Sequence, residues 1–398
     1  MAVKQALLLC LLLGALALLT CHDQGSLGPT GPDLAKGSVS FVAKMRGDPR
    51  PHCHATRVPV AIAADRAPRH SIFGELCLPP GIDRQHVPTI HLAVHGATRS
   101  HLYWGWPYRP GTYSYIDHEL AAGYAVFAID RIGVGQSSHP AGASVTIDVN
   151  AFVLHQVVRA LRSGMIGKIA FQRVVLVGHS LGSIAALAEA SAYHDVDGVV
   201  LTGVSHFSPN GESWLPSLVP ANQDPRFAGR NLDDDYLTTR PGTREATFDY
   251  APVPDAQLIT LDEATKETVT TAELRTMGPI LTSGASFAIR VPVLMVAGQL
   301  DPGVCGGVSI CASLAASAAA FAIAEAPFFA PDACLETAVI PDAGHDLNLD
   351  PSAPVTYEVI RAWADAYVGR YRAAPPCSAG RMDPASGRSL DISVVSSP

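Results

Sequence analysis

The sequence predicts an α/β protein with a mostly parallel β-sheet and helices on both faces. Short apolar runs alternate with stretches of helical spacing along most of the chain. The runs are almost uninterrupted in apolar residues, which is typical of strands buried on both faces. The alternation stops between about 205 and 286 and then resumes, which indicates an insertion. Ligands bind at the carboxyl ends of strands in such sheets, so we expect the insertion to lie there.

The amino-acid composition and net charge indicate a globular protein and argue against some classes of function. A chain of 398 residues can bury one large core with an inserted lobe, or form two domains. Apolar residues make up 48% and charged residues 16%, which is typical of a globular protein. The net charge of −8, without a basic patch interleaved with aromatics, argues against a nucleic-acid partner. No internal repeat is evident.

Residues 1–21 have the pattern of an export signal. Lys4 precedes an apolar run, 6–19, that is too short to span a bilayer comfortably. Cleavage after Ala17 or after Thr20 predicts a secreted or periplasmic chain with no transmembrane span in its mature form. The segment ending at Cys21 also has features of a bacterial lipoprotein signal, so a lipid anchor on Cys21 stays an alternative.

Six cysteines lie beyond residue 21, and an even number favours disulfide bonds. Disulfides persist outside the cytoplasm, so the cysteine count agrees with export. Cys53 and Cys77 flank a predicted hairpin and are the first expected pair. The other four permit several pairings, of which a local Cys305–Cys311 bond, leaving Cys334 and Cys377, is favoured. No C-x-x-C pair is present, so a cysteine zinc site is not indicated, and we expect no metal.

The elements before the insertion form the first part of the core, 51–204, after a loose Gly-, Pro- and Ser-rich lead-in at 22–50. We expect an antiparallel strand pair at 57–64 and 71–78, because each run is bounded by turn residues. Buried strands follow at 89–94, 124–129, 174–177 and 198–204. Residues 150–165 have the one-sided apolar spacing of a helix.

The second half contains the insertion, a second core part and a tail. The cap insertion, 205–286, holds helical patches at 260–271 and 271–277. The second core part, 287–372, is expected to contain strands at 291–298 and 335–340 and helices at 314–324 and 355–371. Residues 373–398 are predicted to be a C-terminal tail.

Ser180 has the sequence surroundings of a nucleophile. The run 174–177 leads into Gly-His-Ser-Leu-Gly, and an Ala- and Leu-rich stretch typical of a helix follows. This G-x-S-x-G spacing between strand and helix is that of a nucleophile elbow. A Cβ at Gly178 or Gly182 would collide with the neighbouring strand or helix. The competing interpretation is a glycine-rich turn with an idle serine.

A serine hydroxyl needs a base, and the base needs an orienting group. His345 follows the last predicted strand and Asp301 follows the strand at 291–298. The order Ser180, Asp301, His345 is the Ser…Asp…His order of this kind of hydrolase. Taken singly, His345 is also compatible with a surface loop and Asp301 with a turn or helix cap.

Other carboxylates are weaker choices for the acid. Asp342 and Asp346 are near His345 only in sequence, which does not make them its partner. The strand at 198–204 ends without a carboxylate, although some relatives of this architecture place the acid there. Asp301 is therefore the predicted acid.

Two backbone N–H groups are expected to hold the oxygen that becomes negative when a carbonyl is attacked. Leu181, directly after the nucleophile, supplies one. Ala97, in the loop after the strand at 89–94, is the choice for the second, with Thr98 as the alternative. His95 is expected to be a packed, hydrogen-bonded support.

Aromatic residues near this loop are candidates for the substrate pocket. Tyr103, Trp104 and Trp106 could line an apolar acyl or alcohol pocket, and core packing beneath the cap is an equal alternative. Trp214 is the corresponding choice in the insertion, and the same two interpretations apply to Phe207, Phe248 and Tyr250.

Two further motifs have structural interpretations. The stretch 130–138 contains G-x-G but lacks the Lys of a phosphate-binding loop, so we expect a tight turn. The three acidic residues at 233–235 are expected to form a solvated turn, with cation binding as the alternative.

Taken together, these residues resemble the α/β-hydrolase superfamily. The resemblance is carried by His95-Gly96, Asp130-Arg131 with Gly133 and Gly135, the elbow 178–182, Asp301 and Gly344-His345, and it extends over roughly 57–372. It implies an eight-stranded, mostly parallel sheet, a cap after the sixth strand and no cofactor. The cysteine-rich loop after Asp301 departs from the general pattern.

The combination predicts an exported serine hydrolase that cleaves a small, apolar carboxylic ester or a lactone through an acyl-enzyme. A serine at the elbow disfavours epoxide and haloalkane hydrolysis, which use aspartate there in this superfamily. An aminopeptidase or amidase is the alternative enzyme, with Glu212 and 233–235 as candidates to hold the substrate amine. A non-catalytic ligand-binding protein of the same fold is the alternative outside enzymes. The oligomeric state is not predicted.

Overall fold

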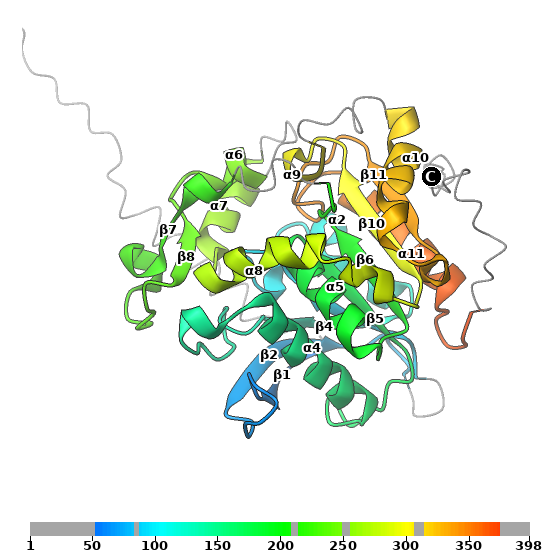
Figure 1. Ribbon diagram of the computed structural model, residues 1–398, viewed down its shortest axis with the longest axis horizontal. Helices are drawn as coiled ribbons and strands as arrows, with labels where there is room; N and C mark the ends of the chain where they lie inside the picture. Colours follow the sequence, from blue (N-terminus) through cyan, green and yellow to red (C-terminus); the bar gives the residue numbers. More distant parts are fainter. Residues whose placement is uncertain (1–51, 83–86, 208–213, 249–254, 306–313, 375–398) are drawn as a thin grey trace, which may run out of the picture.

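A large β-sheet organises the molecule (Figure 1). The computed structural model describes residues 52–82, 87–207, 214–248, 255–305 and 314–374. Its eight-stranded sheet has the order β1-β2-β4-β3-β5-β6-β10-β11. The strands are β1 (Cys53–Val60), β2 (His70–Cys77), β3 (Ile90–Val94), β4 (Ala125–Ile129), β5 (Val174–His179), β6 (Gly198–Thr202), β10 (Val293–Gly298) and β11 (Glu336–Ile340).

The predicted mostly parallel sheet is confirmed. β2 pairs antiparallel with β1 and with β4, and every other neighbouring pair in this sheet is parallel. Every residue of β3, β4, β5, β6, β10 and β11 is buried. Strands covered on both faces consist largely of apolar residues, which is why the sequence shows almost uninterrupted apolar runs.

Helices cover both faces of the sheet, as expected. One face carries α4 (Ile147–Arg162), α5 (Leu181–Tyr193) and α10 (Leu314–Glu325). The other carries α2 (Pro110–Tyr113), α3 (Tyr115–Ala121) and α11 (Ala353–Tyr367). Thr146 begins α4 by accepting a hydrogen bond from the Val149 N–H, a cap that satisfies an otherwise unpaired donor. The sequence pattern does not predict α2 and α3.

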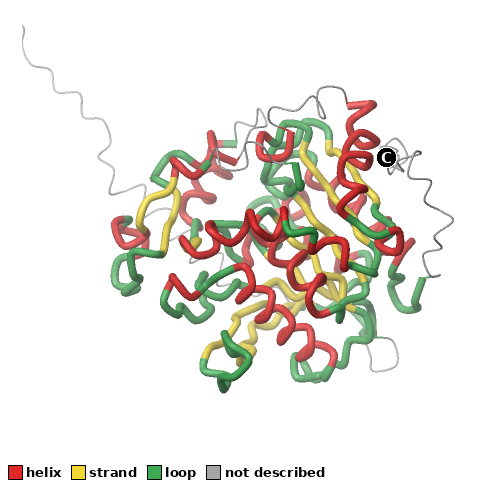
Figure 2. The backbone as a smooth tube through the Cα atoms, viewed as in Figure 1, coloured by secondary structure: helices red, strands yellow, loops and turns green. Residues whose placement is uncertain are grey.

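The chain leaves the large sheet between β6 and β10. There it forms a second, three-stranded antiparallel sheet of β7 (Leu218–Pro220), β8 (Tyr236–Thr239) and β9 (Val269–Thr270). Figure 2 shows this smaller sheet apart from the large one. The helices of this segment are α6 (Arg244–Phe248), α7 (Ala256–Thr265) and α8 (Thr271–Thr282). The predicted cap, 205–286, falls in this segment.

The cap elements differ from the sequence expectation in one respect. The helix expected at 260–271 ends at Thr265, because Val269–Thr270 pairs with β8. Thr270 then caps α8 in a reciprocal capping box with Glu273, so the new helix starts at once. A short strand between two helices has no periodicity of its own, and only the pairing with β8 reveals it.

Buried ion pairs attach the cap to the core. Arg131, after β4, pairs with Glu273 of α8, and both side chains are buried. Asn150 of α4 also donates to Glu273, at 3.0 Å. Glu273 is therefore surrounded by donors from two core elements, which places α8 across α4 and α5 (Figure 1).

The predicted Cys53–Cys77 disulfide is confirmed, and it joins directly paired residues of β1 and β2. Cys334 is also disulfide-bonded. The pairing expected among the remaining cysteines involves Cys311 and Cys377, which lie outside the described residues. The signal, the lead-in and the tail are outside them as well. Within the described part of the chain, no helix is long and apolar enough to cross a membrane.

Candidate active site

Ser180 lies at the tip of a sharp turn between β5 and α5. Its backbone has φ 53° and ψ −122°, a conformation that costs free energy in a non-glycine residue. A Cβ on Gly178 would lie 2.5 Å from the Ser183 Cα, and one on Gly182 would lie 2.3 Å from the Val94 carbonyl oxygen. Both glycines are therefore needed for the close approach of strand and helix, as the sequence indicated.

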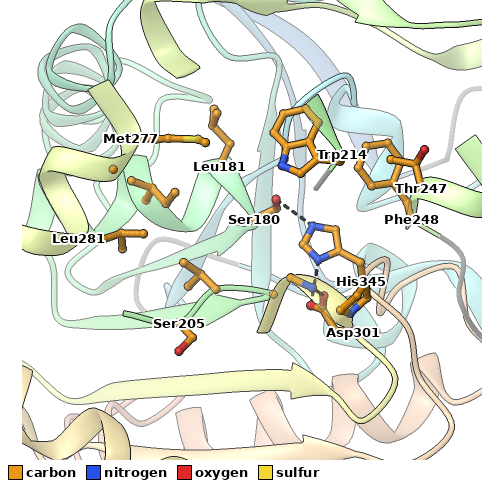
Figure 3. Close-up of a pocket in the computed structure, with 16 residues that line it drawn as sticks. Ser180, Leu181, Ser205, Trp214, Thr247, Phe248, Met277, Leu281, Asp301 and His345 are labelled. Atoms are coloured by element: carbon orange, nitrogen blue, oxygen red, sulfur yellow. Dashed lines mark hydrogen bonds and ion pairs between the residues drawn. The ribbon is translucent and has the colours of Figure 1, made fainter. Parts of the chain in front are cut away.

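Three side chains from distant parts of the chain converge at this turn. His345 Nε2 lies 2.9 Å from Ser180 Oγ, and His345 Nδ1 lies 2.8 Å from Asp301 Oδ2 (Figure 3). The Asp301 carboxylate is fully buried and also accepts a hydrogen bond from the Gly303 N–H at 2.8 Å. These distances permit a proton to pass from the serine to the imidazole while the carboxylate holds the ring.

The two carboxylates next to His345 in sequence point elsewhere. Asp342 is exposed. Asp346 is buried and pairs with the Arg99 guanidinium and with His179 Nε2. Neither contacts the His345 ring through a hydrogen bond in the described structure.

Two other histidines near the site are neutral supports. His95 Nε2 accepts the Arg131 backbone N–H at 3.0 Å, so Nδ1 carries the proton and donates to the Gly96 carbonyl. Burial and the nearby Arg131 charge lower the pKa of His95 to about 3. Burial, His345 and Arg99 hold the pKa of His179 well below its usual value. Neither ring therefore competes with His345 as a base.

The backbone next to Ser180 has the form of an anion site. Leu181 begins α5, so its N–H has no partner within the helix. The loop after β3 approaches closely, since a Cβ on Gly96 would lie 3.0 Å from the Ser180 Cβ. Ala97, next in this loop, is buried. Leu181 and Ala97, whose N–H groups are the expected oxyanion donors, thus belong to two segments that meet at Ser180.

A comparison with models of protein families shows to which family the chain belongs. Residues 92–356 match the model of the alpha/beta hydrolase family. The chain belongs to the alpha/beta hydrolase family. No curated protein matches the sequence at a significant level.

Solved structures agree with this family at the level of the fold. A bacterial membrane phospholipase A matches with 16% identity, a TM-score of 0.51, and coverage of 84% of this chain and 92% of that one. A carboxyl esterase from Bacillus coagulans has 16% identity, a TM-score of 0.51, and coverage of 79% and 98%. An epoxide hydrolase from Vigna radiata has 15% identity, a TM-score of 0.51, and coverage of 80% and 100%. These enzymes differ in substrate, so the likeness concerns architecture alone.

A pocket of about 150 Å³ opens at Ser180 in this alpha/beta hydrolase. Trp214 and Phe248 lie on one side of the serine, and Met277 and Leu281 of α8 lie on the other (Figure 3). Among the pocket-lining residues that the structure describes, most are apolar and Asp301 is the one carboxylate. These residues are Ser180, Leu181, Ile184, Gly203, Val204, Ser205, Trp214, Thr247, Phe248, Met277, Gly278, Leu281, Asp301, Pro302, Gly303 and His345.

Tyr103, Trp104 and Trp106 do not line this pocket. All three are buried in the core on the α3 and α11 face of the sheet. Tyr103 stacks on the His179 ring at 4.5 Å, and Trp104 packs edge-on against Tyr115. Core packing, the second interpretation that the sequence left open, describes them, and we do not include them among the proposed substrate contacts. Trp214 does line the pocket.

The two remaining sequence motifs have local structural roles. Asp130 is buried and accepts hydrogen bonds from the His101 and Gln136 N–H groups, which closes a tight turn. Asp233 accepts from the Gly142 N–H, and Asp235 pairs with the Thr271 hydroxyl. The acidic residues at 233–235 are therefore engaged in contacts of the cap, away from the pocket lining.

The sequence pattern did not identify the α8 residues of the pocket, or a buried hydrogen-bonded group behind the pocket. Met277 and Leu281 are four residues apart, which places them on one helix face, a signal that was present in the sequence. In this group, the Glu325 carboxylate accepts a hydrogen bond from Ser205 Oγ at 2.6 Å and lies 2.5 Å from His206 Nδ1. Glu325 thereby fixes the segment that leaves β6 along the pocket wall.

Proposed function

We propose that this alpha/beta hydrolase is a serine hydrolase that cleaves carboxylic esters or lactones through an acyl-enzyme. The observation that carries the proposal is the continuous hydrogen-bonded chain from Ser180 through His345 to Asp301, at an apolar pocket. A hydroxyl with a base 2.9 Å away can attack a carbonyl carbon, which an isolated serine cannot do at neutral pH.

The proposed mechanism assigns one role to each group. Ser180 Oγ attacks the acyl carbon while His345 Nε2 accepts its proton, and the leaving alcohol later takes that proton. Asp301 holds the imidazolium through Nδ1, and the N–H groups of Leu181 and Ala97 stabilise the oxyanion. Water then enters by the same base catalysis and releases the acid, which regenerates the serine.

The pocket supports a short, apolar acyl group. An apolar cavity of this size accommodates a molecule of about six carbon atoms, and Trp214, Phe248, Met277 and Leu281 give the pocket walls mainly carbon atoms. An aminopeptidase would need a free carboxylate to hold the substrate amine, and among the described lining residues the one carboxylate, Asp301, is bound to His345. Glu212, a candidate for that role, lies outside the described residues.

Export belongs to the same proposal. The disulfide between Cys53 and Cys77 is compatible with an oxidising compartment, where such bonds persist. We propose that residues 1–21 direct the chain out of the cytoplasm, with lipidation of Cys21 as the alternative to a free secreted or periplasmic form. The intact mass of the mature protein distinguishes the two.

The test is labelling of the folded protein with a fluorophosphonate, followed by peptide mapping and a series of p-nitrophenyl esters. We expect the label on Ser180, the highest kcat/KM for acyl chains of about two to six carbons, and a loss of about 10⁴-fold or more in Ser180→Ala. The Ser183→Ala variant serves as the control, because Ser183 donates to a backbone carbonyl. Labelling elsewhere, or full activity of Ser180→Ala, would refute the proposal.

A further inference from the structure

A second cluster of chemically active side chains lies between α4 and α5, outside the pocket of Ser180. His155 projects from α4, Glu189 from α5, and Asp195 from the loop after α5. One ligand-type atom from each residue lies within 4.8 Å of the other two. α4 and α5 pack side by side on the same face of the sheet, so the cluster bridges two elements (Figure 1).

Glu189 is the unusual member of this cluster. Its side chain is fully buried and faces the Asp195 carboxylate, and no N–H or hydroxyl group in the described structure donates to either of its oxygens. The buried Asp195 Oδ1 accepts from no such donor either. Buried carboxylates are costly unless a proton, a donor or a cation compensates them. Burial and the facing Asp195 carboxylate accordingly raise the pKa of Glu189 well above its usual value.

The nearest cationic side chain is directed elsewhere. Arg162 donates to the backbone carbonyls of Asp195 and Gln172, and to the Asp197 carboxylate at 2.6 Å. His155 Nδ1 contacts Asp195 Oδ2 at 2.7 Å, and no hydrogen bond links it to Glu189. The two carboxylates therefore face one another beside one imidazole nitrogen, where α4 meets the end of α5.

We propose that His155, Glu189 and Asp195 bind one zinc ion, which joins α4 to the end of α5. One imidazole nitrogen and two carboxylates are a zinc-type donor set, whereas calcium and magnesium prefer oxygen ligands alone. Ligand atoms around tetrahedral zinc lie roughly 3.3–3.5 Å apart, given metal–ligand bonds of about 2.0–2.2 Å. Zinc binding would draw the three atoms, which lie within 4.8 Å of one another, to that spacing, and the side chains of His155 and Asp195 are about one-fifth exposed, so that solvent can reach the site.

The position of the cluster indicates a structural role. Glu189 follows Ser180 by nine residues along the helix, which corresponds to about 13 Å at 1.5 Å per residue. The ion would not touch the reacting atoms. It would instead neutralise the buried carboxylates and hold the far end of the helix that carries the elbow. The inference does not depend on the proposed esterase activity.

The test uses the full protein after EDTA treatment and dialysis, titrated with zinc chloride by calorimetry. We expect one ion per chain with a dissociation constant in the micromolar range or tighter, and a rise of about 2 °C or more in the unfolding temperature at saturation. Glu189→Gln and Asp195→Asn should each weaken binding at least about tenfold and remove the thermal shift. Cobalt in place of zinc should give visible absorption bands in the wild type only.

The matched control is His54→Ala, which removes an exposed histidine of β1 and should leave zinc binding unchanged. Without metal, Glu189→Gln should unfold at the same temperature as the wild type or higher, because the neutral amide can donate to the facing Asp195 carboxylate without taking up a proton. Equal zinc uptake by the wild type and both carboxylate variants would place the ion elsewhere and overturn the proposal. The absence of zinc binding in the wild type would overturn it too and leave a proton shared by Glu189 and Asp195.

Discussion

At the scale of single residues, the chemistry depends on how tightly each group is held. Ser180 has a positive φ that its flanking glycines permit. Asp301 is fully buried, and both of its carboxylate oxygens accept hydrogen bonds, from His345 and from the Gly303 N–H. Such enclosure keeps the direction of the carboxylate constant, which is what an orienting group requires.

The assignment of the acid leads to the first prediction. Asp301→Asn should lower kcat by about 10³- to 10⁴-fold, because an amide favours the wrong tautomer of His345. Asp342→Asn is the matched control and should stay within about twofold, since Asp342 is exposed and its backbone N–H donates to Gln299. The measurement is kcat for a p-nitrophenyl ester in both variants. A larger loss in Asp342→Asn would show that the acid is misassigned.

At the scale of elements, the site lies where core and cap meet. The loop after β3 carries Arg99, which pairs with Asp262 of α7 and with Asp346 beside the proposed base. Arg244 of α6 also pairs with Asp262, at 2.6 Å. The His345 backbone N–H donates to the carbonyl of Phe248, the last residue of α6. These contacts connect the cap both to the loop after β3 and to the loop that carries His345.

This network leads to the second prediction. Arg99→Met should reduce the free energy of unfolding by about 3–5 kcal/mol, because it leaves the buried Asp346 carboxylate facing only the neutral His179 ring. Arg66→Met is the control, since Arg66 pairs with Asp65 at the surface and should have almost no effect. Chemical denaturation measures both. Equal stability of the two variants would contradict the proposed importance of the network.

The third prediction concerns α8 and rests on the proposed activity. Leu281→Trp should narrow the pocket and reduce kcat/KM for a hexanoate ester at least about tenfold relative to the wild type. The kcat/KM for an acetate ester should stay within about threefold of the wild-type value. Only the longer acyl chain needs the space beside α8. Thr282→Trp is the matched control, because Thr282 is the next residue, is exposed and is not among the pocket-lining residues. A parallel loss for both esters would indicate that Leu281 does not border the acyl group.

At the scale of the whole molecule, buried histidines couple stability to pH. Burial lowers the pKa of His91, in the middle strand β3, from 6.5 to about 3. The unfolded chain therefore takes up this proton first as pH falls. The contribution of His91 to the free energy of unfolding is complete above about pH 6.5 and declines below it, by about 1.4 kcal/mol at pH 5.5.

The fourth prediction isolates this effect. His91→Asn should be less stable than the wild type at pH 7.5, because it loses packing and the contact with Tyr115 at 2.6 Å. The stability difference should narrow by about 1.4 kcal/mol at pH 5.5, since only the wild type loses stability through this histidine. Denaturant titrations at the two pH values measure it, with His54→Ala, an exposed site, as the control. A difference independent of pH would mean that the pKa of His91 is the same in the folded and the unfolded protein.

Much of the fold could be predicted because its signals are local. The almost uninterrupted apolar runs predict the buried strands β3, β5 and β10. The glycines around Ser180 predict the sharp turn, because both signals depend on residues close by in the sequence. The antiparallel pair closed by Cys53 and Cys77 was also readable from turn residues and spacing. In contrast, β9 exists only because it pairs with β8, and no periodicity over two residues could reveal it.

The sequence by itself determined the alternation of strands and helices, the elbow, and a serine, an acid and a histidine in a chemically meaningful order. Only the tertiary structure decided that His345 lies between Ser180 and Asp301, that α8 forms a pocket wall, and that Tyr103 and the two neighbouring tryptophans pack in the core. The physical reason is that backbone strain and burial periodicity act between close neighbours along the chain. The convergence of side chains depends on how distant segments pack, and the orientation of an aromatic ring toward core or cavity is settled only by that packing.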